Sequence, residues 1–108
     1  MNDSLIADLP GPILVIGASG FLGSNLLRRL LSVRQDVFGT FYSNSAWRLQ
    51  GLPTNNFLYL DLAEHAGVRG LVKRVQPRVI FDCSAFGAYS FEQDYGRITA
   101  PTIWALSN

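Results

Sequence analysis

Three glycines at equal spacing are the residues of this sequence whose positions most directly suggest chemistry. Gly17, Gly20 and Gly23 lie in the stretch G-A-S-G-F-L-G, which follows a short apolar run and precedes a segment with helical periodicity. Between a strand and a helix, such glycines allow a tight bend, close approach of the backbone to a phosphate, and close helix packing. The stretch therefore predicts a pyrophosphate-binding loop, with the helix N-terminus supplying N–H groups and the positive end of its dipole. The backbone of three further residues is expected to contribute: Ser19, Phe21 and Leu22.

Two other interpretations of this loop are open from the residues alone. It could be a glycine-rich turn that binds nothing, which a spacing pattern by itself does not exclude. A Walker-type P-loop is disfavoured, because no Gly-Lys-Ser/Thr sequence follows. The position of the loop directly after a predicted strand favours phosphate binding.

The elements that position this loop alternate between strands and helices. Short apolar runs rich in branched side chains predict strands buried in a parallel sheet, over residues 13–16, 37–41, 57–60 and 79–81. Helical spacing of apolar residues predicts helices over residues 21–32 and 68–75, with at most a short helix over 45–50. This alternation is typical of an α/β doubly wound fold with helices on both faces, and right-handed crossovers give the strand order 3-2-1-4. A ligand crevice is then expected at the carboxyl ends of the first and fourth strands.

The two ends of the chain carry weaker patterns. Residues 1–11 finish in a Pro/Gly cluster and are interpreted as a leader that precedes a single domain over residues 12–108. Residues 91–98 and 102–106 are interpreted as helical. The later strands of a complete doubly wound sheet are therefore not expected in this chain.

The composition excludes several classes of protein. A length of 108 residues accommodates one domain, and the single cysteine, Cys83, cannot form an internal disulfide and is interpreted as a small core residue. The net charge of +1 offers no electrostatic footprint for nucleic acid or a membrane surface. No apolar run is long enough to span a bilayer, and the N-terminus lacks the pattern of a signal peptide. The cytoplasm is therefore the expected location.

Three stretches together resemble the extended short-chain dehydrogenase/reductase superfamily. Residues 16–23, I-G-A-S-G-F-L-G, are similar to its cofactor loop T-G-x-x-G-F-x-G, with Ile16 in place of the threonine. Asp61 and the following leucine resemble the Asp-Leu/Val pair after the third strand of that superfamily. Residues 77–85, P-R-V-I-F-D-C-S-A, resemble its P-D-V-V-I-H-x-A-A stretch, with Asp82 in the histidine position. The resemblance covers residues 13–85 and includes the nucleotide-sugar epimerases, dehydratases and reductases, among which the dTDP-4-dehydrorhamnose reductase-like group is most similar.

The resemblance implies a Rossmann-like fold, an NAD(P) cofactor and a role for particular residues. The Asp61 carboxylate, with Leu62 beside it, would accept a hydrogen bond from the adenine amino group. Ser84 and Ala85 would lie beneath the second half of the dinucleotide. Asp61 could instead cap a helix that begins near residue 63, since aspartate is a favoured N-cap. Asp82 could be a strand-end carboxylate that faces solvent.

The end of the second strand bears on the choice between NAD and NADP. An acidic side chain there would bind the ribose 2′-hydroxyl and favour NAD. The candidates at this position, Tyr42 and Ser43, carry no carboxylate. A 2′-phosphate would not be repelled and could meet Ser43 or Arg48. NADP is therefore the favoured cofactor.

The catalytic residues of the superfamily are absent from this sequence. Its chemistry uses a Tyr-x-x-x-Lys pair, in which tyrosine is the general acid/base, whereas the single lysine, Lys73, has Arg69 four residues before it. The sequence also has no Cys/His cluster that would bind a metal. We therefore expect either the NAD(P)-binding part of a larger nucleotide-sugar reductase or epimerase, or a non-catalytic NAD(P)-binding sensor or interaction module.

The oligomeric state is expected to separate these two alternatives. A cofactor-binding part of a larger enzyme would leave the apolar fourth strand, residues 79–81, as an unprotected edge through which the chain self-associates. A self-sufficient module would be a stable monomer that binds the dinucleotide without turnover. A nucleotide-sugar substrate is expected only with the further residues that a larger enzyme would supply.

Overall fold

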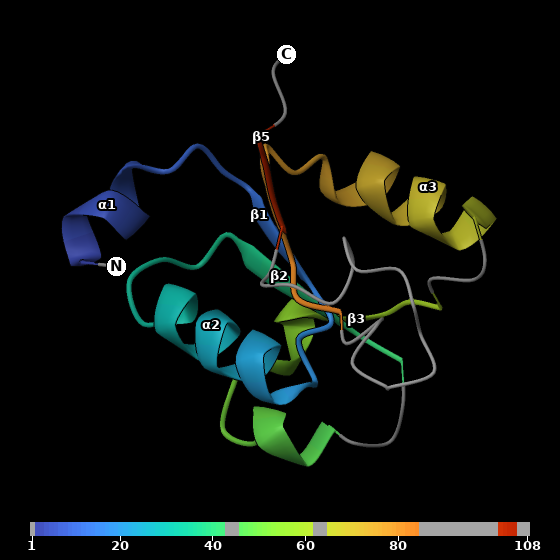
Figure 1. Ribbon diagram of the computed structural model, residues 1–108, viewed down its shortest axis with the longest axis horizontal. Helices are drawn as coiled ribbons and strands as arrows, with labels where there is room; N and C mark the ends of the chain where they lie inside the picture. Colours follow the sequence, from blue (N-terminus) through green and yellow to red (C-terminus); the bar gives the residue numbers. More distant parts are fainter. Residues whose placement is uncertain (1, 43–45, 62–64, 85–101, 106–108) are drawn as a thin grey trace.

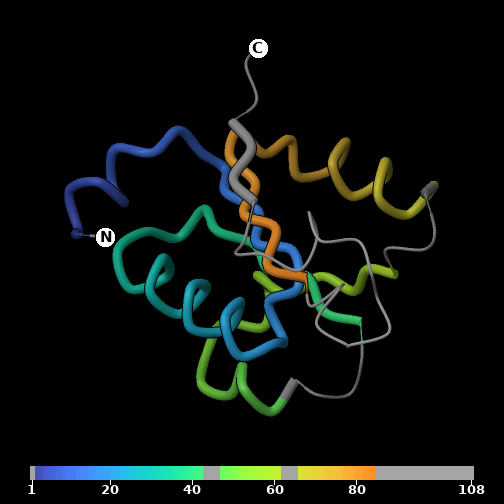
Figure 2. The backbone as a smooth tube through the Cα atoms, in the orientation of Figure 1, coloured from blue at the N-terminus to red at the C-terminus, as the bar shows by residue number. Residues whose placement is uncertain are grey.

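The protein is built around one twisted sheet. The computed structural model describes residues 2–42, 46–61, 65–84 and 102–105. Four parallel strands are ordered β3-β2-β1-β4, as the sequence predicts, and an antiparallel β5 follows β4 at one edge. Figures 1 and 2 show the four parallel strands crossing the centre of the molecule. Their bounds are β1 Ile13–Ile16, β2 Val37–Phe41, β3 Phe57–Tyr59, β4 Val79–Asp82 and β5 Thr102–Ala105.

Helices cover both faces of this sheet. One face carries α1 and α2, and the opposite face carries α3 (Figure 1). Two single-turn 3-10 helices, η1 and η2, lie in the connection between β2 and β3. The bounds are α1 Asp3–Asp8, α2 Phe21–Leu31, η1 Ala46–Leu49, η2 Thr54–Asn56 and α3 His65–Val75. The predicted α/β Rossmann-like arrangement is thus confirmed.

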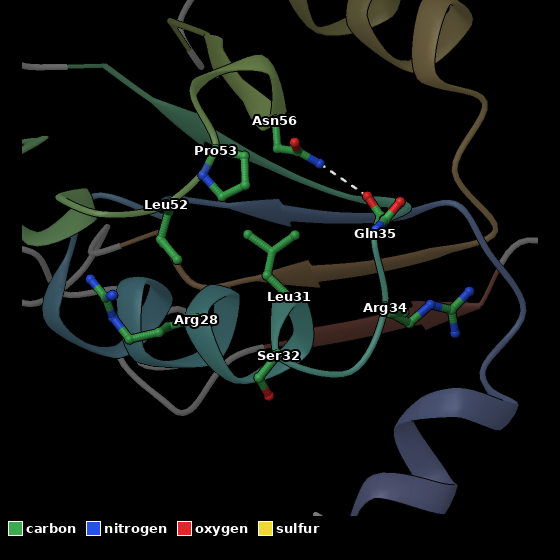
Figure 3. Close-up of a pocket in the computed structure, with 8 residues that line it drawn as sticks. All are labelled: Arg28, Leu31, Ser32, Arg34, Gln35, Leu52, Pro53 and Asn56. Carbon is green, nitrogen blue, oxygen red and sulfur yellow. Dashed lines mark hydrogen bonds between the residues drawn. The ribbon is translucent and has the colours of Figure 1, made fainter.

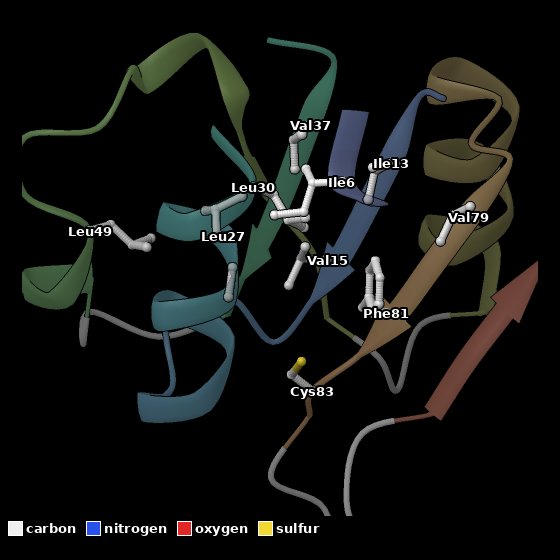
Figure 4. Close-up of a cluster of buried hydrophobic side chains, with 11 residues drawn as sticks. Ile6, Ile13, Val15, Leu27, Leu30, Val37, Leu49, Val79, Phe81 and Cys83 are labelled. Carbon is white, nitrogen blue, oxygen red and sulfur yellow. The ribbon is translucent and has the colours of Figure 1, made fainter. Parts of the chain in front are cut away.

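The core lies in two layers because the side chains of each strand alternate between the faces of the sheet. On the α1 and α2 face, Ile13 and Val15 of β1 pack with Leu27 and Leu30 of α2 (Figure 4). On the α3 face, Leu14 packs in a second cluster with four other buried residues: Ile16, Leu60, Leu71 and Ile80. All four residues of β1 are buried, which explains why its sequence is a continuous apolar run rather than an alternating one.

The predicted helix over residues 102–106 is wrong. Thr102–Ala105 is the strand β5, whose residues pair with β4 from Val79↔Ala105 to Asp82↔Thr102. The T-I-W sequence contains β-branched and aromatic residues, which fit a strand better than a helix. The edge of β4 is therefore paired within the chain, which corrects the prediction of an exposed fourth-strand edge. The predicted helix over residues 91–98 lies outside the described residues.

The segment interpreted as a leader contains a helix that packs on the core. The side chain of Asn2 caps α1 by accepting a hydrogen bond from the N–H of Leu5 at 2.9 Å, and Ile6 is fully buried. Arg34 donates to the carbonyl oxygens of Ile6 and Leu9, at 2.9 and 2.6 Å. The division into a leader of residues 1–11 and a domain from residue 12 stays a prediction.

In the part of the chain that the structure describes, no helix combines the length and apolarity needed to cross a bilayer.

Candidate functional site

The glycine loop leaves β1 at the carboxyl edge of the sheet and turns sharply at Gly17. Its φ of +77° is in the left-handed region, which favours glycine. A Cβ at this position would also lie 2.8 Å from the backbone nitrogen of Ser84, in the turn that follows β4. Gly17 is therefore required both by the backbone conformation and by the close approach of the neighbouring strand end.

Gly20 and Gly23 meet different surroundings. A Cβ at Gly23 would collide with the carbonyl oxygen of Gly17, so the first turn of α2 packs directly on the loop. A Cβ at Gly20 would have only one near neighbour, the same oxygen at 3.6 Å. The close packing at Gly23 is thus against the loop, and the role of Gly23 in a cofactor site stays a prediction. At Gly20 the space beside the backbone is open, which is where a phosphate could approach.

The loop ends at the N-terminus of α2. Gly20 is the N-cap and makes no side-chain cap, and the N–H of Ser24 donates to its carbonyl at 2.9 Å. The N–H groups of the first helical turn have no acceptor within the helix itself. Phe21 and Leu22 in that turn are exposed, and Ser19 before it is half-buried. This cradle fits a pyrophosphate, because it presents backbone donors at the positive end of a helix dipole.

Thr40 of β2 holds the glycine loop against the sheet. This residue is not among those predicted from the sequence. Its Oγ1 accepts a hydrogen bond from the N–H of Gly17 at 3.0 Å, and its carbonyl accepts one from Ala18 at 2.8 Å. Its side chain is buried. A hydroxyl in a strand whose other buried positions are apolar or glycine was the signal that could have identified it.

The end of β4 lies beside the loop. The register pairs Ile16 with Asp82, and the N–H of Cys83 donates to the Ile16 carbonyl at 2.8 Å. The half-buried Asp82 accepts a hydrogen bond from the N–H of Ser84 at 3.0 Å, which shapes the turn next to Gly17. The structure thus brings Ser84 to the loop, while Ala85 lies outside the described residues.

Cys83 is buried in the core cluster, as its interpretation as a small core residue predicts. Burial, with the nearby Asp82 carboxylate as a second cause, raises the pKa of the thiol to about 11. The thiol is therefore protonated at neutral pH and is a poor nucleophile.

Aromatic side chains gather where β2 and β3 end. The rings of Phe41 and Tyr59 are 5.8 Å apart at an angle of 77°, and the ring of Tyr42 lies 6.0 Å from that of Tyr59. Leu60 donates its N–H to the carbonyl of Phe41 at 2.9 Å, so the half-buried Asp61 follows directly at the same edge. Helix α3 is described from His65, and the three residues between it and Asp61 lie outside the described residues, so both roles considered for Asp61 stay predictions. Two further predicted site residues, Ser43 and Leu62, are outside the described residues.

Arg48 extends from η1 to the glycine loop. Its Nη1 lies 3.4 Å from the carbonyl oxygen of Ser19, and its guanidinium carbon lies 4.4 Å from the centre of the Trp47 ring. Arg48 is one of the predicted partners of a 2′-phosphate. The structure places its positive charge beside Ser19 of the loop.

A cavity of about 490 Å³ lies elsewhere, between the end of α2 and the segment before β3 (Figure 3). Leu31, Leu52 and Pro53 line it, and Asn56 beside it donates to the carbonyl of Gln35 at 3.0 Å. The cavity lies towards the C-terminal end of α2, whereas the glycine loop precedes the N-terminal end of that helix. It is not part of the candidate dinucleotide site.

Comparison with known proteins gives one match. The sequence model of the NAD dependent epimerase/dehydratase family matches residues 13–101, which include every strand of the parallel sheet and the glycine loop. No curated protein and no solved structure was found to match the chain. The extended short-chain dehydrogenase/reductase resemblance is supported at this level, and its cofactor is a nicotinamide dinucleotide. The chain belongs to the NAD dependent epimerase/dehydratase family, whose function is of the NAD-dependent oxidoreductase type.

Proposed function

We propose that this chain binds the dinucleotide across the carboxyl edge of its sheet, with the pyrophosphate over the glycine loop. The observation that carries this proposal is the geometry of three glycines. Gly17 has a positive φ, Gly23 has no room for a Cβ, and Gly20 faces open space at the N-terminus of α2. Ser19, Phe21 and Leu22 would contribute backbone groups to the same cradle.

The two halves of the dinucleotide would extend from the loop in opposite directions. On the β2 and β3 side, Asp61 with Leu62 would meet the adenine, near Tyr42 and Ser43. On the β4 side, Ser84 and Ala85 would lie beneath the nicotinamide half. Support comes from the strand order, since β2 and β4 flank β1 and all four parallel strands end at one edge.

We propose NADP as the preferred cofactor. Tyr42, directly after β2, offers no carboxylate to bind a ribose 2′-hydroxyl. Arg48 presents a guanidinium beside Ser19, and arginine is suited to bind phosphate through two parallel hydrogen bonds. The 2′-phosphate would therefore be bound by the positively charged Arg48 guanidinium.

The activity proposed for the protein to which this chain contributes is reduction or epimerisation of a nucleotide-linked sugar, as in the dTDP-4-dehydrorhamnose reductase-like group. The dinucleotide supplies hydride transfer when bound. The residues present here bind and orient it, because the sequence contains no Tyr-x-x-x-Lys pair. Support for the sugar substrate comes from the sequence resemblance.

Calorimetric titration with NADPH and NADH tests the cofactor proposal. We expect both to bind, with NADPH about tenfold tighter, which corresponds to roughly 1.4 kcal/mol. GTP serves as a control polyphosphate without the nicotinamide riboside. Absence of binding by both dinucleotides would overturn the proposed site, and equal affinities would overturn the NADP preference alone.

A non-catalytic NAD(P)-binding sensor or interaction module is the second candidate. The observation that favours it is the pairing of β5 with β4, which removes the expected route to self-association through the β4 edge. Light scattering with and without NADPH distinguishes the candidates. A monomer that binds NADPH supports the module, whereas cofactor-independent self-association argues against it.

A further inference from the structure

A hydrogen-bonded arginine connects helix α2 to the segment that carries Arg48. The Nη2 of Arg28 donates to the carbonyl oxygen of Arg48 at 2.8 Å and to that of Gln50 at 3.2 Å. Both acceptors are at the end of η1. One guanidinium nitrogen therefore holds the backbone of Arg48 and of a residue two positions later.

The same segment is fixed on its inner side by Leu49. This side chain is buried in the core cluster with Leu27 and Leu30 of α2. The buried Leu49 side chain holds η1 against α2. One buried side chain does not fix the rotation of the turn about it. The two hydrogen bonds from Arg28 supply that second constraint, because they fix two carbonyl groups in direction.

With η1 held in this way, the Arg48 guanidinium can bind an anion. Among the described residues it makes no ion pair, and its hydrogen bond to the Ser19 carbonyl is long, at 3.4 Å. Hydrogen bonds from arginine to phosphate are about 2.7–2.9 Å and roughly twice as strong as neutral ones. Exchanging the Ser19 carbonyl for a phosphate oxygen would therefore be favourable, provided that η1 keeps the guanidinium beside the loop.

We propose that Arg28 is a positioning residue for cofactor selection. By holding the carbonyls of Arg48 and Gln50, it keeps the Arg48 guanidinium next to Ser19, where the 2′-phosphate of NADP is bound. Arg28 itself does not touch the cofactor. This inference rests on the proposed NADP preference, and it adds a residue on the helix surface to the determinants of that preference.

A double-mutant cycle on the full chain tests this role, with dissociation constants for NADPH and NADH measured by calorimetry. We expect Arg48→Gln to weaken NADPH binding about tenfold and Arg28→Gln about three- to tenfold, each with less than about a twofold change for NADH. In the Arg48→Gln background, Arg28→Gln should have no further effect on NADPH. A merely structural role for Arg28 would weaken both dinucleotides equally.

Arg29→Gln is the matched control. It removes the same charge from the adjacent position of α2, where Arg29 pairs with Asp3 of α1 and donates to the hydroxyl of Ser32. We expect it to leave the ratio of the two dissociation constants unchanged. If Arg28→Gln fails to fold, Arg28→Met carries the same cycle, because methionine keeps an unbranched stem and a high helix propensity but has no hydrogen-bond donor.

The possible results distinguish the proposed function from the proposed role of Arg28. A wild-type chain that binds neither dinucleotide overturns the proposed function. A chain that prefers NADPH, but in which the Arg28 effect persists without Arg48 or applies equally to NADH, overturns the role of Arg28 alone. Equal wild-type affinities for the two dinucleotides overturn the NADP preference and this inference together.

Discussion

The atoms nearest to each glycine of the loop determine what that glycine contributes. A Cβ added to Gly23 would lie 2.1 Å from the carbonyl oxygen of Gly17, so a methyl group there must displace the helix or the loop. At Gly20 the nearest atom to an added methyl group is 3.6 Å away, an ordinary van der Waals contact. One residue is therefore needed by the fold, and the other is expected to matter only when a phosphate is present.

Alanine substitutions at these two glycines should differ in their effects on the free energy of unfolding and on NADPH affinity. We expect Gly23→Ala to lower the free energy of unfolding by about 1–3 kcal/mol, the usual cost of overpacking. Gly20→Ala should leave the unfolding free energy nearly unchanged but weaken NADPH binding about tenfold, because its methyl group would occupy space beside the phosphate. Urea denaturation and calorimetry on both variants measure the two quantities.

Gly70→Ala serves as the control, since a Cβ at this position of α3 meets nothing within 4 Å. It should bind NADPH like the wild type and be slightly more stable, as expected for glycine replaced by alanine inside a helix. Equal losses of affinity in Gly20→Ala and Gly70→Ala would remove the argument for a phosphate at Gly20.

At the scale of an element, α1 shows how a short helix can be held by side chains from elsewhere. Arg34 donates to two carbonyls at its C-terminal end and forms an ion pair with Asp36 at 2.6 Å. Gly11 makes room for this pair, because a Cβ there would overlap both side chains. The attachment of α1 therefore depends on a charged pair whose strength changes with pH.

Acid should loosen this attachment. The hydrogen bond from Arg34 lowers the pKa of Asp36 below its ordinary value of 3.8. A carboxyl group with a depressed folded-state pKa contributes stability above its unfolded pKa and loses it as the pH falls through the folded value. We expect Asp36→Asn to be less stable than the wild type at pH 7, with the difference shrinking below about pH 4.

Urea denaturation of both chains from pH 7 to pH 2.5 measures this difference, and Asp8→Asn on α1 provides a control. The Asp36 side chain is 44% exposed, so the effect should be modest and should weaken in salt. A stability difference that stays constant down to pH 2.5 would contradict the role assigned to the ion pair.

The sequence predicts the elements of this fold unequally, for physical reasons that differ between them. Strand β1 is a continuous apolar run because all four of its residues are buried, and helix α2 is long enough to have a clear apolar periodicity. Helix α1 has six residues and one buried side chain, so its only sequence signal is the Asn2 cap. Strand β5 has β-branched and aromatic residues, but four residues are too few to distinguish a strand from a helix without the pairing with β4.

The part of the site that is formed by backbone groups could be predicted from the sequence. Gly17 and Gly23 are visible in a sequence because no other residue fits their conformation or packing. Thr40 and Arg28 donate or accept hydrogen bonds with residues more than 15 positions away, and although the hydroxyl in an apolar strand singles out Thr40, no local pattern identifies these partners. Positioning residues of this kind emerge only when the strands and helices are assembled.

At the scale of the whole molecule, the pairing of β5 determines which surface the sheet offers to other chains. The strand β4 is apolar, V-I-F, and its three apolar residues are buried. Beside it, β5 forms antiparallel pairs along the whole length of β4. Without β5, a row of unpaired N–H and C=O groups on an apolar strand would be exposed, which is a template for pairing with a second chain.

Removal of β5 should therefore convert a monomer into a self-associating species. We expect a chain that ends at residue 101 to form dimers or larger assemblies at concentrations where the full chain is monomeric, as measured by light scattering. Hydrogen exchange should show faster exchange in β4 of the shortened chain under dilute conditions, while β1, between β2 and β4 in the sheet, stays protected. The full chain with Ser107→Ala serves as the control for a change near the C-terminus. A shortened chain that remains monomeric with a protected β4 would show that β5 is dispensable for covering this edge, because the pairing of β4 with β1 alone would then suffice.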